Sequence, residues 1–161
     1  MNNKYCGNVS DYAPVSEDQS RVVIMYGLNV KEDGESAEWR QLDFYKKQGK
    51  PSFEQVKAAI IADINARVKE KIIGGFVWND KPVWLSEENQ LNFSQAVVPV
   101  TLKIGEEEDG TPIYHQFDTA EDLKAFSDAC NAWKQQCLTA GYAEKDSIDW
   151  APYEALFPTN E

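Results

Sequence analysis

The feature that most constrains the fold is a run of apolar side chains that recur every three or four residues between positions 53 and 72. This spacing places one side chain per turn on the same face of an α-helix, at Phe53, Val56, Ile60, Ile64, Val68 and Ile72. Gly74 and Gly75 follow this run, and we expect them to end the helix because glycine tolerates a left-handed cap. Such a helix needs a second apolar layer to cover its face.

Strand-like runs occur in adjacent pairs around this helix. The paired runs are residues 21–30 with 38–47, residues 76–78 with 83–85, and residues 98–105 with 111–117. Each pair is separated by a short segment rich in turn-forming residues, which is typical of antiparallel hairpins. The pattern therefore predicts an α+β fold, in which antiparallel β-hairpins pack with three α-helices, and excludes a doubly wound parallel sheet.

Two more helices and a tail complete the predicted elements. One helix begins after Ser86 and ends near Pro99; the other begins after Thr119 and ends at Gly141. The tail at residues 148–157 is rich in aromatic side chains, so we expect it to dock on the domain. Residues 1–20 show little periodicity and are predicted to form an extended or poorly ordered arm.

The length of the chain and the positions of its glycine and proline residues predict a single compact domain with an N-terminal appendage. A chain of 161 residues can bury one ordinary core but not two full ones. Gly49 and Pro51 mark a joint between an arm and hairpin at residues 1–50 and a helix-hairpin-helix-hairpin-helix domain at residues 51–161.

The formal net charge of -11 argues against nucleic-acid binding, which depends on Lys and Arg side chains that displace counterions from phosphates. The longest apolar run begins at Val22 and is far shorter than the ~20 residues of a membrane span. The first twenty residues lack the apolar region of a secretory signal, so we expect a protein of the producing cell's cytoplasm.

No pattern in the sequence indicates catalysis, a metal or a cofactor. His115 is the only histidine and alternates with Ile113 and Phe117 in a predicted strand, so we interpret it as structural or merely exposed. The cysteines lack the spacing of a zinc site, and we interpret them as small core residues, at Cys6, Cys130 and Cys137. The acidic run at 106–109 lacks the ligand spacing of a calcium loop and predicts a solvated turn. We expect no enzyme and no cofactor.

The hairpin at residues 76–85 has apolar side chains on both sides. We expect Trp78 to lie opposite Val83 and Phe76 opposite Leu85, with all four on the core side. The other side then carries Val77 and Trp84. Exposed aromatic side chains are typical anchors of protein contacts, so the candidate contact surface consists of Val77, Trp84 and Trp39.

A set of short motifs resembles a domain of unknown function that recurs in phage and prophage tail-fibre and tail-associated proteins. The motifs are an "IN" pair on the first helix, a "GF" step before the hairpin and a "Q-x-N" pair after it, at Ile64, Asn65, Gly75, Phe76, Gln90 and Asn92. The resemblance covers about residues 52–140. It implies a non-enzymatic, tail-associated structural protein of the bacteriophage virion, whose partners are other phage proteins or its own copies in a homo-oligomer.

Two alternatives remain open at this point. The strong negative charge would suit an acidic inhibitor that covers a basic surface on a host protein. The five tryptophans would suit a carbohydrate-binding module in which indole rings stack on sugars. Gln90 and Asn92 are expected to fix the hairpin against the following helix through amide hydrogen bonds.

Overall fold

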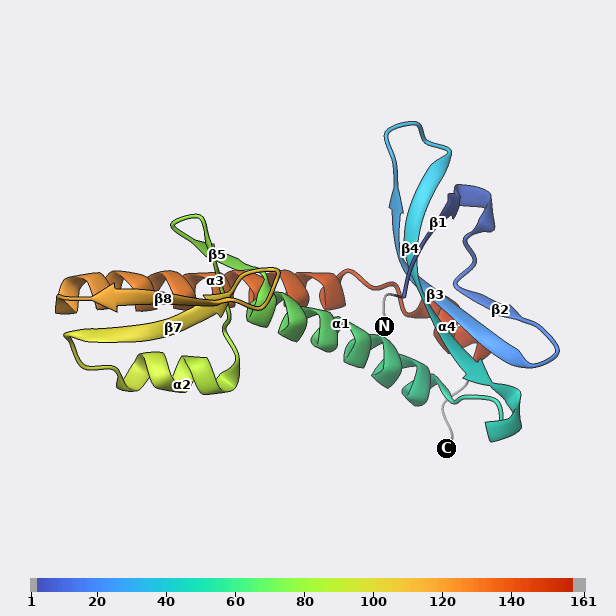
Figure 1. Cartoon of the computed structure of the whole chain (residues 1–161). Helices are drawn as coiled ribbons and strands as arrows, with labels where there is room; N and C mark the ends of the chain where they lie inside the picture. Colours follow the sequence, from blue (N-terminus) through green and yellow to red (C-terminus); the bar gives the residue numbers. More distant parts are fainter. Residues whose placement is uncertain (1–2, 158–161) are drawn as a thin grey trace. The chain divides into compact units, whose positions relative to one another are not determined.

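The computed structural model describes residues 3–157 (Figure 1). It confirms the predicted α+β class, with antiparallel strand pairs and long helices. The chain divides into two compact units, one comprising the chain up to Ile64 together with the chain from Glu144, and the other comprising residues 65–143. The boundaries between the two units lie within the long helices. The domain boundary predicted from Gly49 and Pro51 lies instead before the first helix.

The first unit contains a four-stranded antiparallel sheet of order β1-β4-β3-β2. Its strands are β1 (Lys4–Asn8), β2 (Val15–Glu17), β3 (Arg21–Val30) and β4 (Ser36–Tyr45). The predicted hairpin is confirmed as β3 and β4. Of the two expectations for residues 1–20, an extended arm agrees with strands β1 and β2, whereas a poorly ordered arm is wrong, because β1 pairs with β4 and β2 pairs with β3. Short edge strands of this kind are stabilised by pairing with the neighbouring strand, so their sequence need not show a periodic pattern.

Helix α1 (Phe53–Gly74) contributes its residues up to Ile64 to this unit, and helix α4 (Ala151–Leu156) lies wholly within it. The predicted apolar face of α1 is buried, with Val56, Ile60 and Ile64 fully inaccessible. The predicted docking of the tail is also confirmed. Tyr153 and Phe157 are buried, and the Tyr153 hydroxyl donates to the carbonyl of Met25 at 2.6 Å.

The second unit packs two hairpins and a short helix against the long helix α3. Its elements are β5 (Phe76–Trp78), β6 (Lys81–Val83), α2 (Glu87–Gln95), β7 (Val100–Glu106), β8 (Pro112–Phe117) and most of α3 (Ala120–Asp146), together with the end of α1. The core is centred on Phe126, whose ring lies 4.9 Å from Trp78, 5.0 Å from Phe93 and 5.1 Å from Phe117 between centroids.

The β5–β6 register differs from the predicted one. Phe76 pairs with Val83 and Trp78 pairs with Lys81, because the connecting turn contains two residues rather than four. Asn79 and Asp80 both have positive φ, at 50° and 61°, as a tight primed turn requires. Since the shift is by two residues, the predicted sides of the hairpin are unchanged.

The end of one helix and the cap conformation of another differ from the predictions. Helix α3 continues past Gly141 to Asp146, and Gly141 instead permits a close contact, since a Cβ there would lie 2.5 Å from Val68 Cγ2. Helix α1 ends at Gly74 as expected, but neither Gly74 nor Gly75 has the left-handed conformation. A Cβ on Gly75 would lie 2.7 Å from the carbonyl oxygen of Lys71.

The contact at Gly141 gives a first prediction. We expect Gly141→Ala to lower the free energy of unfolding by about 1–2 kcal/mol, because overpacking outweighs the gain of about 1 kcal/mol in helix propensity. In a Val68→Ala background the same change should be neutral or stabilising, since the clashing methyl group is gone. Denaturant melts of the four proteins measure this coupling, and additive effects would contradict the contact.

The cysteines are only partly as predicted. Cys130 and Cys137 are buried, but Cys6 is exposed on β1 and is not a core residue. No disulfide links them, since all three are free. Within residues 3–157 no helix is long and apolar enough to cross a membrane.

Candidate contact surface

The outward side of the β5–β6 hairpin exposes two large apolar side chains. Val77 is 60% exposed and Trp84 is 42% exposed, whereas Phe76, Val83 and Leu85 on the inward side are buried. Val77 pairs directly with Pro82, and alternation along the chain places Trp84 on the same side as Pro82. Exposure of this side agrees with the predicted positions of Val77 and Trp84.

The backbone at Trp84 is held from several directions. Its N–H donates to the carbonyl of Ile104 on β7 at 2.9 Å, and its carbonyl accepts from the Asn89 side chain at 2.9 Å. The next residue, Leu85, donates its N–H to the carbonyl of Ile73 at 2.9 Å. The indole is therefore presented by a fixed backbone rather than by a loose loop, which limits the entropy lost when a partner binds.

A hollow of about 730 Å³ lies beside Trp84, lined by Pro82, Trp84 and the acidic tip Glu106–Asp109. The tip is closed by two backbone bonds, from Glu107 N–H to the carbonyl of Thr111 and from Gly110 N–H to the carbonyl of Glu107. Hydrogen bonds from the side chain and backbone of Thr111 lower the pKa of Asp109. The carboxylate therefore stays ionised at neutral pH.

The charges around the hollow favour a cationic partner group. Lys103 forms an ion pair with Glu106, while Glu107, Glu108 and Asp109 are exposed beside the indole. An ammonium or guanidinium group gains from the face of an indole ring and from charge-assisted hydrogen bonds to carboxylates. The sequence-based interpretation of 106–109 as a solvated turn missed this proximity to Trp84.

Trp39 does not belong to this surface. It is only 6% exposed and lies in the first unit, where its ring meets Tyr12 edge-on at 6.2 Å between centroids. Its indole N–H is buried and has no hydrogen-bond partner among residues 3–157. The prediction of Trp39 as a surface residue is therefore wrong, because the segment that follows β1 covers it.

The motif residues occupy several places in the fold. Ile64 and Phe76 are buried, whereas Asn65 and Gly75 are exposed. The Gln90 side chain donates to the carbonyl of Leu85 at 2.7 Å and accepts from Lys134 Nζ at 2.9 Å, so it ties α2 to the end of the hairpin as expected. Asn92 is exposed and makes no side-chain hydrogen bond within the described chain; Asn89 provides the second amide bond.

The residues considered for catalysis have structural surroundings. His115 lies against Trp78 and Phe117, at 4.8 Å and 4.6 Å between ring centroids. Burial raises the pKa of the Cys130 thiol to about 12, which disfavours the thiolate needed for nucleophilic chemistry. Residues 3–157 contain no group of three or more His, Cys, Asp or Glu side chains that could hold a metal ion.

Comparison with known proteins identifies a family over most of the chain. Residues 55–159 match the family described as Domain of unknown function (DUF4376). The match supports the predicted resemblance to a domain of unknown function and extends it beyond residue 140 into the tail. No curated protein and no solved structure matches the chain.

Proposed function

The chain belongs to the DUF4376 family, and we propose that it is a non-enzymatic structural or accessory protein of a phage or prophage that acts through protein contacts. The short motifs of residues 64–92 support the association with a phage tail, through their resemblance to tail-associated proteins. The exposed side of the β5–β6 hairpin supports the contact function. Its partners are other phage proteins or further copies of this chain.

The single observation that carries the proposal is the exposure of Trp84 on a fixed backbone. An indole that is 42% exposed, next to exposed Val77 and a broad hollow, has the composition of a contact hot spot. Exposed apolar side chains that gather on one side of an element, as Val77 and Trp84 do, are typical of sites where another protein docks. The neighbouring carboxylates give the surface a preference for a basic partner.

We expect Trp84→Ala to weaken self-association or binding to the products of neighbouring phage genes by about tenfold or more, the usual effect of removing an aromatic hot spot. Leu91→Ala is the matched control, because Leu91 is a large apolar side chain of the same unit, 56% exposed, and does not line the hollow. Sedimentation equilibrium measures self-association, and calorimetric titration measures binding to each purified neighbour.

Two results would count against this proposal. One is a wild-type protein that stays monomeric and binds none of the neighbouring gene products. The other is an equal loss of binding in Trp84→Ala and Leu91→Ala, which would indicate that the surface around Trp84 has no special role.

A second candidate function is an acidic inhibitor that covers a basic surface of a host protein. The carboxylates of Glu106–Asp109 beside Trp84 favour it, since they complement Lys and Arg side chains. This candidate requires binding that weakens steeply with added salt and that depends on the acidic tip. A variant carrying Glu107→Gln, Glu108→Gln and Asp109→Asn should then lose binding to the host protein, whereas a tail assembly contact centred on Trp84 should weaken but persist, because the indole remains in place.

A further inference from the structure

The strand β3 has an edge that is only half occupied. Strand β2 pairs with it from Glu17 opposite Val22 to Val15 opposite Ile24, and the last bond on this edge runs from Met25 N–H to the carbonyl of Pro14 at 2.9 Å. Proline has no N–H to continue the ladder. Beyond this bond no described strand pairs with this edge of β3.

The backbone groups of Leu28 and Val30 point toward this open edge. A bulge between Tyr26 and Asn29 leaves Gly27 and Leu28 without register partners on β4. Lys31 N–H donates to the carbonyl of Ser36 at 2.8 Å, so alternation along the strand directs residues 28 and 30 away from β4. Leu28 and Val30 also have exposed side chains, at 39% and 45%. This edge is a template for another extended chain.

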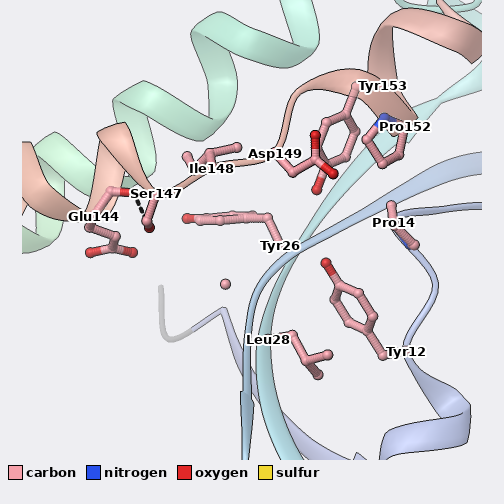
Figure 2. Close-up of a pocket in the computed structure, with 11 residues that line it drawn as sticks. Tyr12, Pro14, Tyr26, Leu28, Glu144, Ser147, Ile148, Asp149, Pro152 and Tyr153 are labelled. Atoms are coloured by element: carbon pink, nitrogen blue, oxygen red, sulfur yellow. Dashed lines mark hydrogen bonds between the residues drawn. The ribbon is translucent and has the colours of Figure 1, made fainter.

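A hollow of about 480 Å³ lies beside the same edge. Figure 2 shows Ser147, Asp149 and Tyr153 along its upper side and Tyr12 and Leu28 along its lower side. All of these residues belong to the first unit. Leu28 belongs both to the open strand edge and to the lining of the hollow, so the edge and the hollow adjoin each other.

Two tyrosine rings of the hollow are fixed in place. The hydroxyls of Tyr153 and Tyr12 both donate to the carbonyl of Met25, at 2.6 Å and 3.3 Å. Burial raises the pKa of both tyrosines, so the hydroxyls keep their protons. Rings that are held before binding lose little entropy when a ligand arrives.

The charge in the hollow is negative. Asp149 is exposed, and one of its oxygens accepts the N–H of Ala151 at 3.1 Å; Glu144 contributes a second carboxylate to the lining. No Lys or Arg side chain lines the hollow within the described chain. The partly exposed ring of Tyr12 and the exposed carboxylate of Asp149 together suit a guanidinium or ammonium group.

We propose that the open edge of β3 binds an extended segment of a partner protein in which apolar and basic residues alternate. The segment adds a strand beside Leu28 and Val30, and one Lys or Arg side chain enters the hollow against Tyr12 and Asp149. Backbone pairing supplies the affinity and the hollow supplies the specificity. This site is separate from the surface around Trp84 and does not depend on the function proposed for that surface.

The test is a titration of the full ¹⁵N-labelled chain with a short blocked peptide of alternating valine and arginine. We expect chemical-shift changes at the amides of Leu28 and Val30, and about tenfold weaker binding of matched peptides with glutamine or glutamate in place of arginine. Asp149→Asn should weaken the arginine peptide by about fivefold or more, while its amide oxygen still caps the N–H of Ala151. Asp146→Asn, which removes an exposed charge outside the hollow, should have little effect.

Three results would overturn the proposal. The glutamine or glutamate peptide could bind as well as the arginine peptide, which would exclude a cation subsite. Arginine amide alone could bind as tightly as the peptide, which would indicate a small-molecule site. Finally, an arginine peptide with N-methylated backbone amides could bind unchanged, which would exclude strand addition. This test alters only the peptide, so the fold of the protein is not perturbed.

Discussion

Replacement of Trp78 by alanine should lower the free energy of unfolding by about 3 kcal/mol, the lower end of the range for a large aromatic side chain, because Trp78 is partly buried against the core. Trp78 packs against Phe126 at 4.9 Å, Phe117 at 6.0 Å and His115 at 4.8 Å between ring centroids. Phe117 and Phe126 are fully inaccessible to solvent. The cavity left by the indole would border the centre of the second unit, where little can collapse to fill it.

Trp84→Ala is the matched comparison, because it removes the same side chain from the opposite side of the same hairpin. We expect it to cost about 1 kcal/mol, since much of the indole is already in water. Guanidinium melts followed by circular dichroism measure both variants. If Trp84→Ala proves the more destabilising in an unchanged monomer, Trp84 belongs to the core and the contact surface is wrong.

The faces of the helices and strands were the part of the fold that the sequence predicted best, because they follow from local periodic patterns. Side chains every three or four residues placed Val56, Ile60 and Ile64 in the core, because a helix repeats its face whatever it packs against. Alternation likewise placed Phe76 inward and Val77 outward. The register of that hairpin was not predictable from alternation alone, because a shift by two residues preserves both sides.

Features that depend on distant partners could not be read from local pattern. Gly141 looks like a helix end, but a Cβ at this position would clash with Val68 on another helix, and nothing near Gly141 in the sequence signals that contact. Trp39 was predicted to be exposed, and its burial depends on a segment some thirty residues earlier in the chain. Short edge strands such as β1 and β2 are hidden from sequence analysis for the same reason.

The candidate site likewise has one feature that the local sequence pattern predicts and one that depends on a distant contact. The exposure of Trp84 followed from alternation within one hairpin, whereas its proximity to Glu106–Asp109 follows from the packing of β6 on β7. That packing is visible in the bond from Trp84 N–H to the carbonyl of Ile104. No local signal joins residues 82–84 to residues 106–109, so the acidic tip by itself could only be interpreted as a solvated turn.

The packing of β6 on β7 depends on Gly105. A Cβ at this position would lie 2.2 Å from the carbonyl oxygen of Pro82 and 3.0 Å from its carbonyl carbon. Both atoms belong to the backbone and cannot rotate away, in contrast to the methyl group of Val68 that faces Gly141. We therefore expect Gly105→Ala to cost about 3 kcal/mol, at the upper end of the range for overpacking, and to separate the two strands.

Gly74→Ala is the control for this variant, because a Cβ there would meet nothing within 4 Å and alanine is the better helix former. Denaturant melts of both variants test the stability, and the chemical shift of the Trp84 indole N–H in ¹⁵N-labelled protein tests the surface. Strand separation would release Trp84 from Ile104 and move the acidic tip away from the indole, so binding of a basic partner should fall even where Gly105→Ala remains folded. If Gly105→Ala melts like the wild-type protein and retains that binding, β6 and β7 do not approach as closely as described, and the hollow beside Trp84 loses its physical basis.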